Sequence, residues 1–403
     1  MGSVANRYDG NFFHYPLSWS LKRRNIVSHI SDSQENYQSL SQKDLNTLSP
    51  AEKYDLVVGD TSFSFSKSVV SRIDQLADNS QIALWSGVCH GWSPASLTFP
   101  RPVRAIDVPI FDGRTVTFYP SDIKALSSYL WGQSFAQGSV KVAGRQCKSG
   151  GKRKKGRLVD PDCFDVNPAF FHVAITHQIG KKRQGIIMDR NFKKRVMNQP
   201  IFKYNYAYYS PVKKEISVKT QRVKQKPLAE AITTLRDYRR DPYEDYRAPN
   251  TKYVVGIEME VTFANETLPK QRETDSTRFD ATDSNIFNYE LELDESLNII
   301  GGEWVLLTPP VATPKNGGPM RGGYWYEHPD LIWIVPNGLE PYSVADGDIS
   351  SLSWNANTPA PAEFKNASIK AASNTGIDFK TGSTLSWPQP LNKVVRALLN
   401  KAK

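Results

Sequence analysis

Several segments in the second half of the chain alternate apolar and polar residues, and this pattern most constrains the fold. Alternation with a period of two residues predicts strands that bury one face against a core. The segments are 201–218, 252–263, 286–293 and 299–307. The residues DESLN between the last two segments are typical of a hairpin turn. We therefore expect an antiparallel sheet in this half of the chain.

The first half of the chain predicts helices. Residues 36–60 read as helical, and Ser49 with Glu52 three residues later forms a capping box. Pro50 between them suits the first position of a helix. Residues 121–135 predict a second helix with Ser121 as its N-cap.

Residues 101–118 predict a hairpin that turns at Asp112-Gly113, and 66–78 predict another short helix. With helices in one half of the chain and strands in the other, the fold class is predicted to be α+β.

Composition divides the chain into three parts. Residues 1–47 read as an irregular and helical segment, and 48–336 as one large domain. Residues 337–403 are rich in polar residues and proline, and they end in the short basic amphipathic helix LNKVVRALLNKAK. No apolar run reaches the length that spans a bilayer, and the first residues lack the apolar centre of a signal peptide.

The chain is basic, with 51 lysine and arginine residues against 41 aspartate and glutamate residues, or a net charge of +10. The excess gathers in 147–157, 180–185 and 191–195. A positive chain favours anionic surfaces, although such runs are typical of solvated loops. No helix-turn-helix or zinc-finger motif accompanies them, so we expect no specific recognition of nucleic acid.

The chain contains three cysteines. A disulfide between Cys147 and Cys163 would close a loop of 15 residues and contribute about 3 kcal/mol in the chain-entropy model. That pairing, which suits an exported protein, would leave Cys89 as a single thiol. Three reduced thiols in a cytoplasmic protein remain the alternative. No CxxC or HExxH motif is present, so no metal site is expected.

Cys89 lies in the segment WSGVCHGWSPAS, between Trp85 and Trp92. A free cysteine is either a small buried apolar residue or a nucleophile. A nucleophilic thiol needs a nearby base. His90 is a poor choice, because neighbouring side chains in an extended or early-helical backbone point apart.

His172 and Asp189 are the better pair. His172 lies in the apolar run 170–179 and Asp189 ends the apolar run 184–191, with a turn-like GKKR between them. If the two runs pair as an antiparallel hairpin, His172 and Asp189 are opposite each other on one face. His177 would have no carboxylate across from it. The pattern predicts His172 as the base and Asp189 as the group that orients it.

Four motifs occur in order along the chain: WSGVCHGWSPAS, DVNPAFFHVAITHQIG, GIIMDRNFKKRVMNQP and LELDESLNIIGGEW followed by HPDLIW. Together they resemble the transglutaminase elicitor family of oomycete secreted proteins and bacterial relatives. The resemblance implies a papain-like core with the nucleophile next to a helix and the histidine and aspartate on adjacent antiparallel strands. It places the catalytic roles on Cys89, His172 and Asp189, and makes 48–336 the catalytic domain.

The resemblance implies protein-glutamine transamidation, in which Cys89 forms a thioester with a glutamine side chain and a lysine amine then resolves it. The partners would be glutamine- and lysine-bearing proteins, and the protein would be secreted. The oxyanion would be held by the Cys89 amide and one further donor, for which Trp85 is the candidate. The residues VMNQP at 196–200 resemble the start of a peptide that plants recognise, with Met197 where that peptide has tryptophan.

Two other functions remain open. A papain-like protease or glutamine deamidase would use the same three residues with water as the final nucleophile. A basic recognition protein without catalysis would need no matched histidine and aspartate. Calcium dependence is undetermined, since Asp275, Asp280, Asp283 and Asp294 lack the spacing of a calcium loop and read as surface positions.

Overall fold

The structure is a computed structural model of the 403-residue chain. It describes residues 2–3, 37–69, 89–133, 140–145, 153–154, 157–158, 165–189, 197–213, 215–217, 222–265, 267, 269–305, 328–336, 349, 351–373, 376–378, 383–385 and 390–403.

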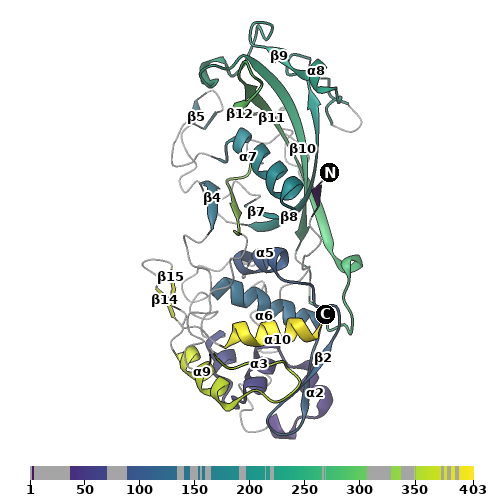
Figure 1. The fold of residues 1–403 in the computed structure, drawn as a ribbon, viewed down its shortest axis with the longest axis vertical. Helices are drawn as coiled ribbons and strands as arrows, with labels where there is room; N and C mark the ends of the chain where they lie inside the picture. Colours follow the sequence, from purple (N-terminus) through teal and green to yellow (C-terminus); the bar gives the residue numbers. More distant parts are fainter. Residues whose placement is uncertain are drawn as a thin grey trace, which may run out of the picture. The chain divides into compact units, whose positions relative to one another are not determined.

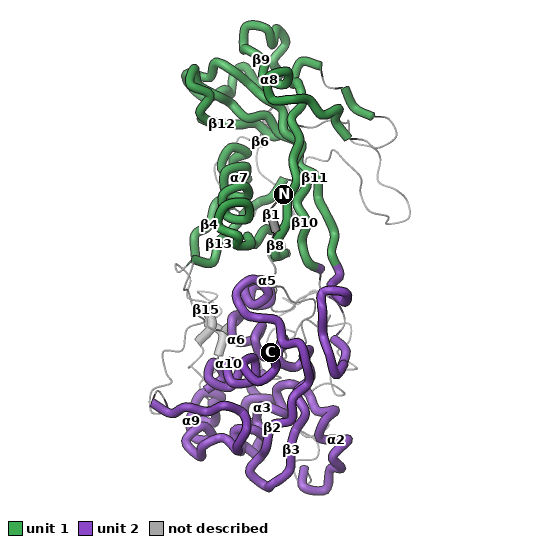
Figure 2. Tube along the Cα trace, turned by 45° about the vertical axis from the view of Figure 1, so that its right-hand side comes forward, with its two compact units in different colours: residues 1–5, 140–264, 282–336 green, residues 6–139, 265–281, 337–403 purple. Residues whose placement is uncertain are grey.

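The chain divides into two compact units (Figure 2). Unit 1 consists of residues 1–5, 140–264 and 282–336, and unit 2 of residues 6–139, 265–281 and 337–403. Each unit is therefore assembled from segments that are distant in the sequence. The division of the chain at residues 47 and 336 stays a prediction from composition.

Unit 1 is built on a curled antiparallel sheet (Figure 1). In the described part of the chain it has nine strands, in the order β12-β11-β10-β8-β7-β13-β4, with β1 beside β8 and β9 beside β10. The strands are β1 (Gly2–Ser3), β4 (Lys141–Gly144), β7 (Ile186–Asp189), β8 (Asn198–Tyr209), β9 (Thr233–Thr234), β10 (Tyr253–Asn265), β11 (Ala281–Leu293), β12 (Ile299–Trp304) and β13 (Leu331–Ile334).

The strands predicted from alternation are present as β8, β10, β11 and β12. The hairpin between β11 and β12 is also confirmed. Asp294 closes its turn by accepting hydrogen bonds from the backbone N–H groups of Ser296 and Asn298, both at 2.8 Å. Short polar side chains that bond to nearby backbone in this way favour tight turns.

The prediction that 170–179 forms a strand is wrong. The run forms helix α7 (Pro168–Ile175), which continues as the π-helix η4 (Thr176–Lys181) before β7 begins. Asn167 caps the helix and Pro168 occupies its first position. A short apolar run cannot distinguish a buried strand from a buried helix, and here the Asn-Pro start signal decides the outcome. His172 and Asp189 are therefore not on adjacent strands, and the predicted hairpin register does not exist.

Unit 2 is mainly helical. Its longer helices are α2 (Gln42–Thr47), α3 (Pro50–Val58), α5 (Cys89–Thr98), α6 (Pro120–Gln133), α9 (Ala362–Ser373) and α10 (Leu391–Lys401). The capping box predicted for α3 is confirmed, because the Ser49 hydroxyl accepts from the Glu52 N–H and the Glu52 carboxylate accepts from the Ser49 N–H. Pro50 occupies the first position of this helix.

The hairpin predicted at Asp112-Gly113 is present as β2 (Ile106–Pro109) and β3 (Thr115–Phe118). Gly113 has a φ of 89°, a left-handed value that glycine adopts without strain. Helix α6 follows, but Ser121 is its second residue and not its cap. The carboxylate of Asp122 instead accepts the Tyr119 N–H at 3.0 Å.

The described parts of the segment after residue 336 contribute to the core of unit 2. The amphipathic helix predicted at the end of the chain is α10, which packs on α6 (Figure 1). Val394, Val395 and Leu398 are fully buried in α10, and Phe364 is fully buried in α9.

The remaining elements are short. They are η2 (Tyr37–Ser39), β5 (Arg153–Lys154), β6 (Arg157–Leu158), α8 (Leu228–Ala231), η5 (Glu244–Tyr246), η6 (Thr277–Phe279), β14 (Gly376–Asp378) and β15 (Ser383–Leu385). In the part of the chain that the structure describes, no helix combines the length and the apolar character needed to cross a membrane.

Candidate active site

Helix α5 begins at Cys89, in agreement with the expectation that the cysteine lies next to a helix. Backbone N–H groups at the start of a helix have no partner within the helix, and the helix dipole places partial positive charge there. Both effects favour the thiolate form of a cysteine at the start of a helix. The start of α5 therefore suits a nucleophilic thiol.

Close contact between α5 and α6 explains the residues that follow Cys89. A Cβ atom on Gly91 would lie 2.1 Å from the Ser128 carbonyl oxygen and 2.4 Å from the Gly132 nitrogen, so only glycine fits. The Nε2 atom of His90 lies 3.2 Å from the carbonyl oxygen of Gly132. His90 thus contacts the backbone of α6. Trp92 is fully buried.

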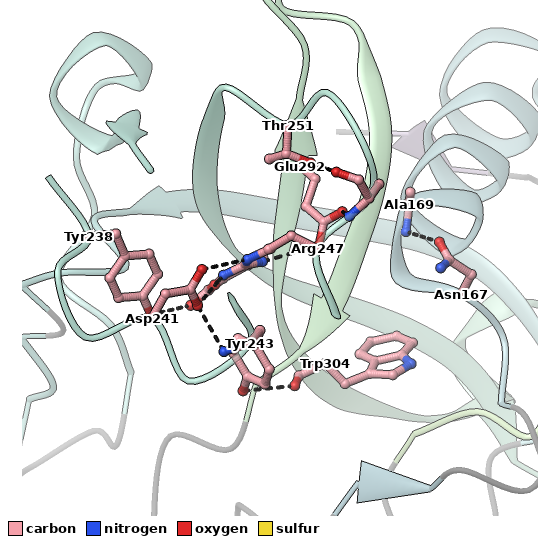
Figure 3. Close-up of polar contacts among 11 residues, drawn as sticks. Asn167, Ala169, Tyr238, Asp241, Tyr243, Arg247, Thr251, Glu292 and Trp304 are labelled. Carbon is pink, nitrogen blue, oxygen red and sulfur yellow. Dashed lines mark hydrogen bonds and ion pairs between the residues drawn. The ribbon is translucent and has the colours of Figure 1, made fainter. Parts of the chain in front are cut away.

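Helix α7 carries the predicted base. The Asn167 side chain accepts a hydrogen bond from the Ala169 N–H at 2.9 Å (Figure 3). It also accepts one from the Phe170 N–H at 3.4 Å, and the two bonds fix the start of the helix. The first turn of α7 also lies close to β12. A Cβ atom on Gly302 would be 3.1 Å from the Ala169 nitrogen and 2.7 Å from the Glu290 carbonyl oxygen, so glycine at this point allows α7 to approach the sheet.

His172 is buried, with 8% of its surface exposed. Its Nδ1 atom lies 2.7 Å from the hydroxyl oxygen of Tyr289 on β11. The ring also forms an edge-to-face contact with Tyr206 on β8, with centroids 5.2 Å apart. Burial lowers the pKa of His172 to about 4, so the imidazole is neutral at physiological pH.

Asp189 is fully buried at the end of β7. Its Oδ1 atom accepts the backbone N–H of Met197 at 2.9 Å, and in the sheet Asp189 is opposite Asn198 on β8 and Leu331 on β13. No hydrogen bond or ion pair joins Asp189 to His172 among the described residues. The structure thus places both residues in unit 1 without joining them, while Cys89 belongs to unit 2.

An aromatic cluster surrounds the first turns of α7, and the sequence did not predict it. Trp304 at the end of β12 packs against Phe171, Tyr289 and the ring of His328, with centroid distances of 5.4, 5.4 and 4.7 Å. The indole N–H of Trp304 donates to the Val166 carbonyl oxygen at 2.9 Å, just before α7. The cluster therefore anchors the start of the helix that carries His172.

A buried ionic cluster lies on the opposite face of β11, because neighbouring residues of a strand point to opposite sides. Arg247 donates to Asp241 at 2.8 Å and to Glu292 at 3.3 Å, and it also contacts Glu290 (Figure 3). Burial by itself would lower the pKa of Arg247, but the hydrogen bonds and charges of Asp241 and Glu290 outweigh it and raise the pKa.

The segment that Arg247 holds in place also reaches the aromatic cluster. The hydroxyl of Tyr243 donates to the Trp304 carbonyl oxygen at 3.1 Å (Figure 3). Gly301 leaves room for the Glu292 carboxylate, since a Cβ atom there would be 2.2 Å from Oε2. The two glycines of IIGGEW thus make room on opposite faces of β12. Gly301 makes room for the Glu292 carboxylate and Gly302 for the start of α7.

Other predicted positions have mixed outcomes. Trp85, Cys147 and Cys163 lie outside the described residues, as does the side chain of Cys89. Asp275 and Asp280 are not surface positions, because both bind Arg101 at 2.7 Å with little exposure of their side chains. In the part of the chain that the structure describes, no group of three or more acidic, histidine or cysteine residues could hold a metal ion.

Comparisons with known proteins agree with the resemblance seen in the motifs. Residues 61–310, more than half of the chain, match the family described as transglutaminase elicitor. The fold is similar to the crystal structure of the GP42 transglutaminase from Phytophthora sojae, with a TM-score of 0.52 and 19% sequence identity. That match covers 100% of this chain and 90% of the other. A comparison with curated protein sequences finds no match.

Proposed function

Because the chain belongs to the transglutaminase elicitor family, we propose that it is an acyltransferase that joins glutamine side chains of proteins to primary amines through a thioester on Cys89. The observation that carries the proposal is the start of α5 at Cys89, within the part of the chain that the family covers. A thiol at the first residue of a helix is favoured in its reactive thiolate form.

The reaction has two steps. His172 takes the proton of the Cys89 thiol as the sulfur attacks the γ-carboxamide carbon of a glutamine, and it passes that proton to the departing ammonia. A lysine ε-amine then attacks the thioester and loses a proton to His172, which releases the isopeptide product and the thiol. His172 is neutral near pH 7 and therefore able to accept a proton. The backbone N–H of Cys89 and a further donor would stabilise the oxyanion, and Trp85 is retained as the candidate for that donor.

The family resemblance gives Asp189 the third role, that of orienting His172. In this structure the Asp189 carboxylate accepts a hydrogen bond from the Met197 N–H. The Nδ1 atom of His172 forms its hydrogen bond with the hydroxyl of Tyr289. The assignment of Asp189 therefore requires either the ring or the carboxylate to move during catalysis. The substitution Asp189→Asn tests it, since loss of an orienting carboxylate should reduce kcat by several orders of magnitude.

The family resemblance also underlies the proposal that the protein is secreted. In an oxidising environment Cys147 and Cys163 would form a disulfide and leave only Cys89 free. Alkylation of natively isolated, denatured but unreduced protein should then label one thiol. Labelling of three thiols would contradict the proposal.

Incorporation of a fluorescent primary amine into a glutamine-rich protein tests the activity. Wild-type protein should incorporate the amine, and Cys89→Ala, shown to be folded by its thermal unfolding, should not. Ammonia is measured in parallel without the amine, because release of ammonia with no incorporation would identify a glutamine deamidase. Adding and withholding calcium in the same assay determines whether the metal is required.

A further inference from the structure

The ring of His172 is held by side chains from the sheet beneath α7. Tyr289 on β11 lies 2.7 Å from Nδ1, and Tyr206 on β8 forms an edge-to-face contact with the ring. Tyr289 itself is fully buried. Of the described side chains, Tyr289 alone forms a hydrogen bond with the imidazole, and no carboxylate forms an ion pair with it.

We infer that Tyr289 is a positioning residue that fixes the ring of His172 in the resting protein, in which no hydrogen bond joins Asp189 to the ring. The inference rests on the proposed function for the catalytic role of His172, although the hydrogen bond can be tested without an activity assay.

Tyr289 meets the requirements of a positioning residue. Such a residue acts through a rigid support, because small errors in the orientation of a catalytic group are costly. The ring of Tyr289 packs edge-on against Phe171 and Trp304, at centroid distances of 6.0 and 5.4 Å. On the other face of β11, Glu290 and Glu292 bind Arg247. The strand that carries Tyr289 is therefore held from both sides.

A phenol and a carboxylate have different effects on a histidine. A carboxylate at Nδ1 stabilises the imidazolium and raises its pKa, whereas a neutral phenol fixes the ring and one tautomer without supplying charge. Burial raises the pKa of the Tyr289 hydroxyl well above its usual value, so the phenol stays neutral. Among the described residues, the other titratable group with a ring contact to His172 is the phenol of Tyr206. The pKa of about 4 for His172 is consistent with this surrounding.

Nuclear magnetic resonance of the full chain, labelled with ¹⁵N-histidine, tests the hydrogen bond directly. His172→Gln identifies the signals of His172 among the six histidines. In wild-type protein we expect one dominant neutral tautomer and a pKa well below 6.5. Tyr289→Phe should convert the signal to a mixture of tautomers, whereas Asp189→Asn should leave both the tautomer and the pKa unchanged. A change in Asp189→Asn with none in Tyr289→Phe would overturn the inference.

Kinetics then show whether the positioning matters for the reaction. Loss of one supporting hydrogen bond should lower kcat about tenfold in Tyr289→Phe and leave KM for a glutamine peptide nearly unchanged. Tyr253→Phe is the matched control, because it removes a phenol oxygen from β10 of the same sheet, at the end of the strand that pairs with β9. If Tyr289→Phe does not fold, the tautomer and pKa of wild-type His172 decide the inference, and a charged imidazole at pH 7 overturns it. A normal kcat in Tyr289→Phe, together with an altered tautomer of His172, would refute the kinetic role of Tyr289. Amine incorporation by Cys89→Ala would instead refute the proposed function.

Discussion

Replacing Gly91 with alanine tests the geometry that positions Cys89. The new methyl carbon would lie 2.1 Å from the Ser128 carbonyl oxygen, and ordinary contact begins at 3.4 Å. The two helices must therefore separate by about 1.3 Å. Both clashing atoms belong to the backbone of α6, so rotation of a side chain cannot relieve the contact. The start of α5, two residues before Gly91, has to move with the helix.

Overpacking of this kind costs about 3 kcal/mol, and the better helix propensity of alanine offsets about 1 kcal/mol. The net loss of about 2 kcal/mol should lower Tm by about 4–8 °C. A displacement of about 1 Å at a nucleophile should reduce kcat by about 100-fold. We therefore expect a protein that is still folded at the assay temperature but has lost most of its kcat.

The assays are thermal unfolding and amine incorporation on purified Gly91→Ala. Gly113→Ala is the control, because a Cβ atom there meets no atom within 4 Å and only the left-handed backbone is strained. We expect this control to lose some stability and to keep its activity. Unchanged Tm and unchanged activity in Gly91→Ala would refute the close contact between α5 and α6.

Three further predictions concern Cys89, His172 and Arg247. The rate of Cys89 alkylation should rise with an apparent pKa below 8.5, and a value at or above 8.5 would contradict the stabilisation of the thiolate by α5. His172 has a lower pKa in the folded state than in the unfolded state, so the unfolded state binds more protons between about pH 4 and 6.5. The free energy of unfolding should therefore fall by about 3 kcal/mol as the pH drops through this window, and urea unfolding of His172→Gln should lack this part of the slope. Arg247→Met removes the cation that binds buried carboxylates, and it should lower the free energy of unfolding in urea by about 3–5 kcal/mol. Arg236→Met is the control, because that side chain is 91% exposed, and it should change the free energy of unfolding little. Equal effects of the two substitutions would contradict a structural role for the ionic cluster.

Local signals in the sequence predicted much of the fold. The capping box at Ser49 and Glu52, the turn at Asp112-Gly113 and the alternation in β10 and β11 each depend on residues within a few positions of one another. Contacts of this kind leave a pattern in the sequence, and the structure confirms all of them. The amphipathic pattern of α10 belongs to the same class, although its packing on α6 could not be predicted.

The candidate site was harder to predict, because its contacts are distant in the sequence. Tyr289 is 117 residues from His172, and no periodicity links them. The expected pairing of His172 with Asp189 assumed a hairpin that does not exist. Its apolar residues fit a helix as well as a strand, and the decisive signal was the Asn167-Pro168 start, which periodicity alone does not weigh. The roles of the two glycines in β12 likewise emerge only when both faces of the strand are known.

The central claim is that a thioester forms on Cys89. Its most direct test is mass spectrometry of the full-length protein after brief reaction with a glutamine peptide at acidic pH and rapid quenching. The claim predicts an adduct with the mass of the peptide minus one ammonia, located on the fragment that contains Cys89 and discharged by added amine. A folded Cys89→Ala protein that still incorporates amine, or an adduct located on another residue, would contradict it.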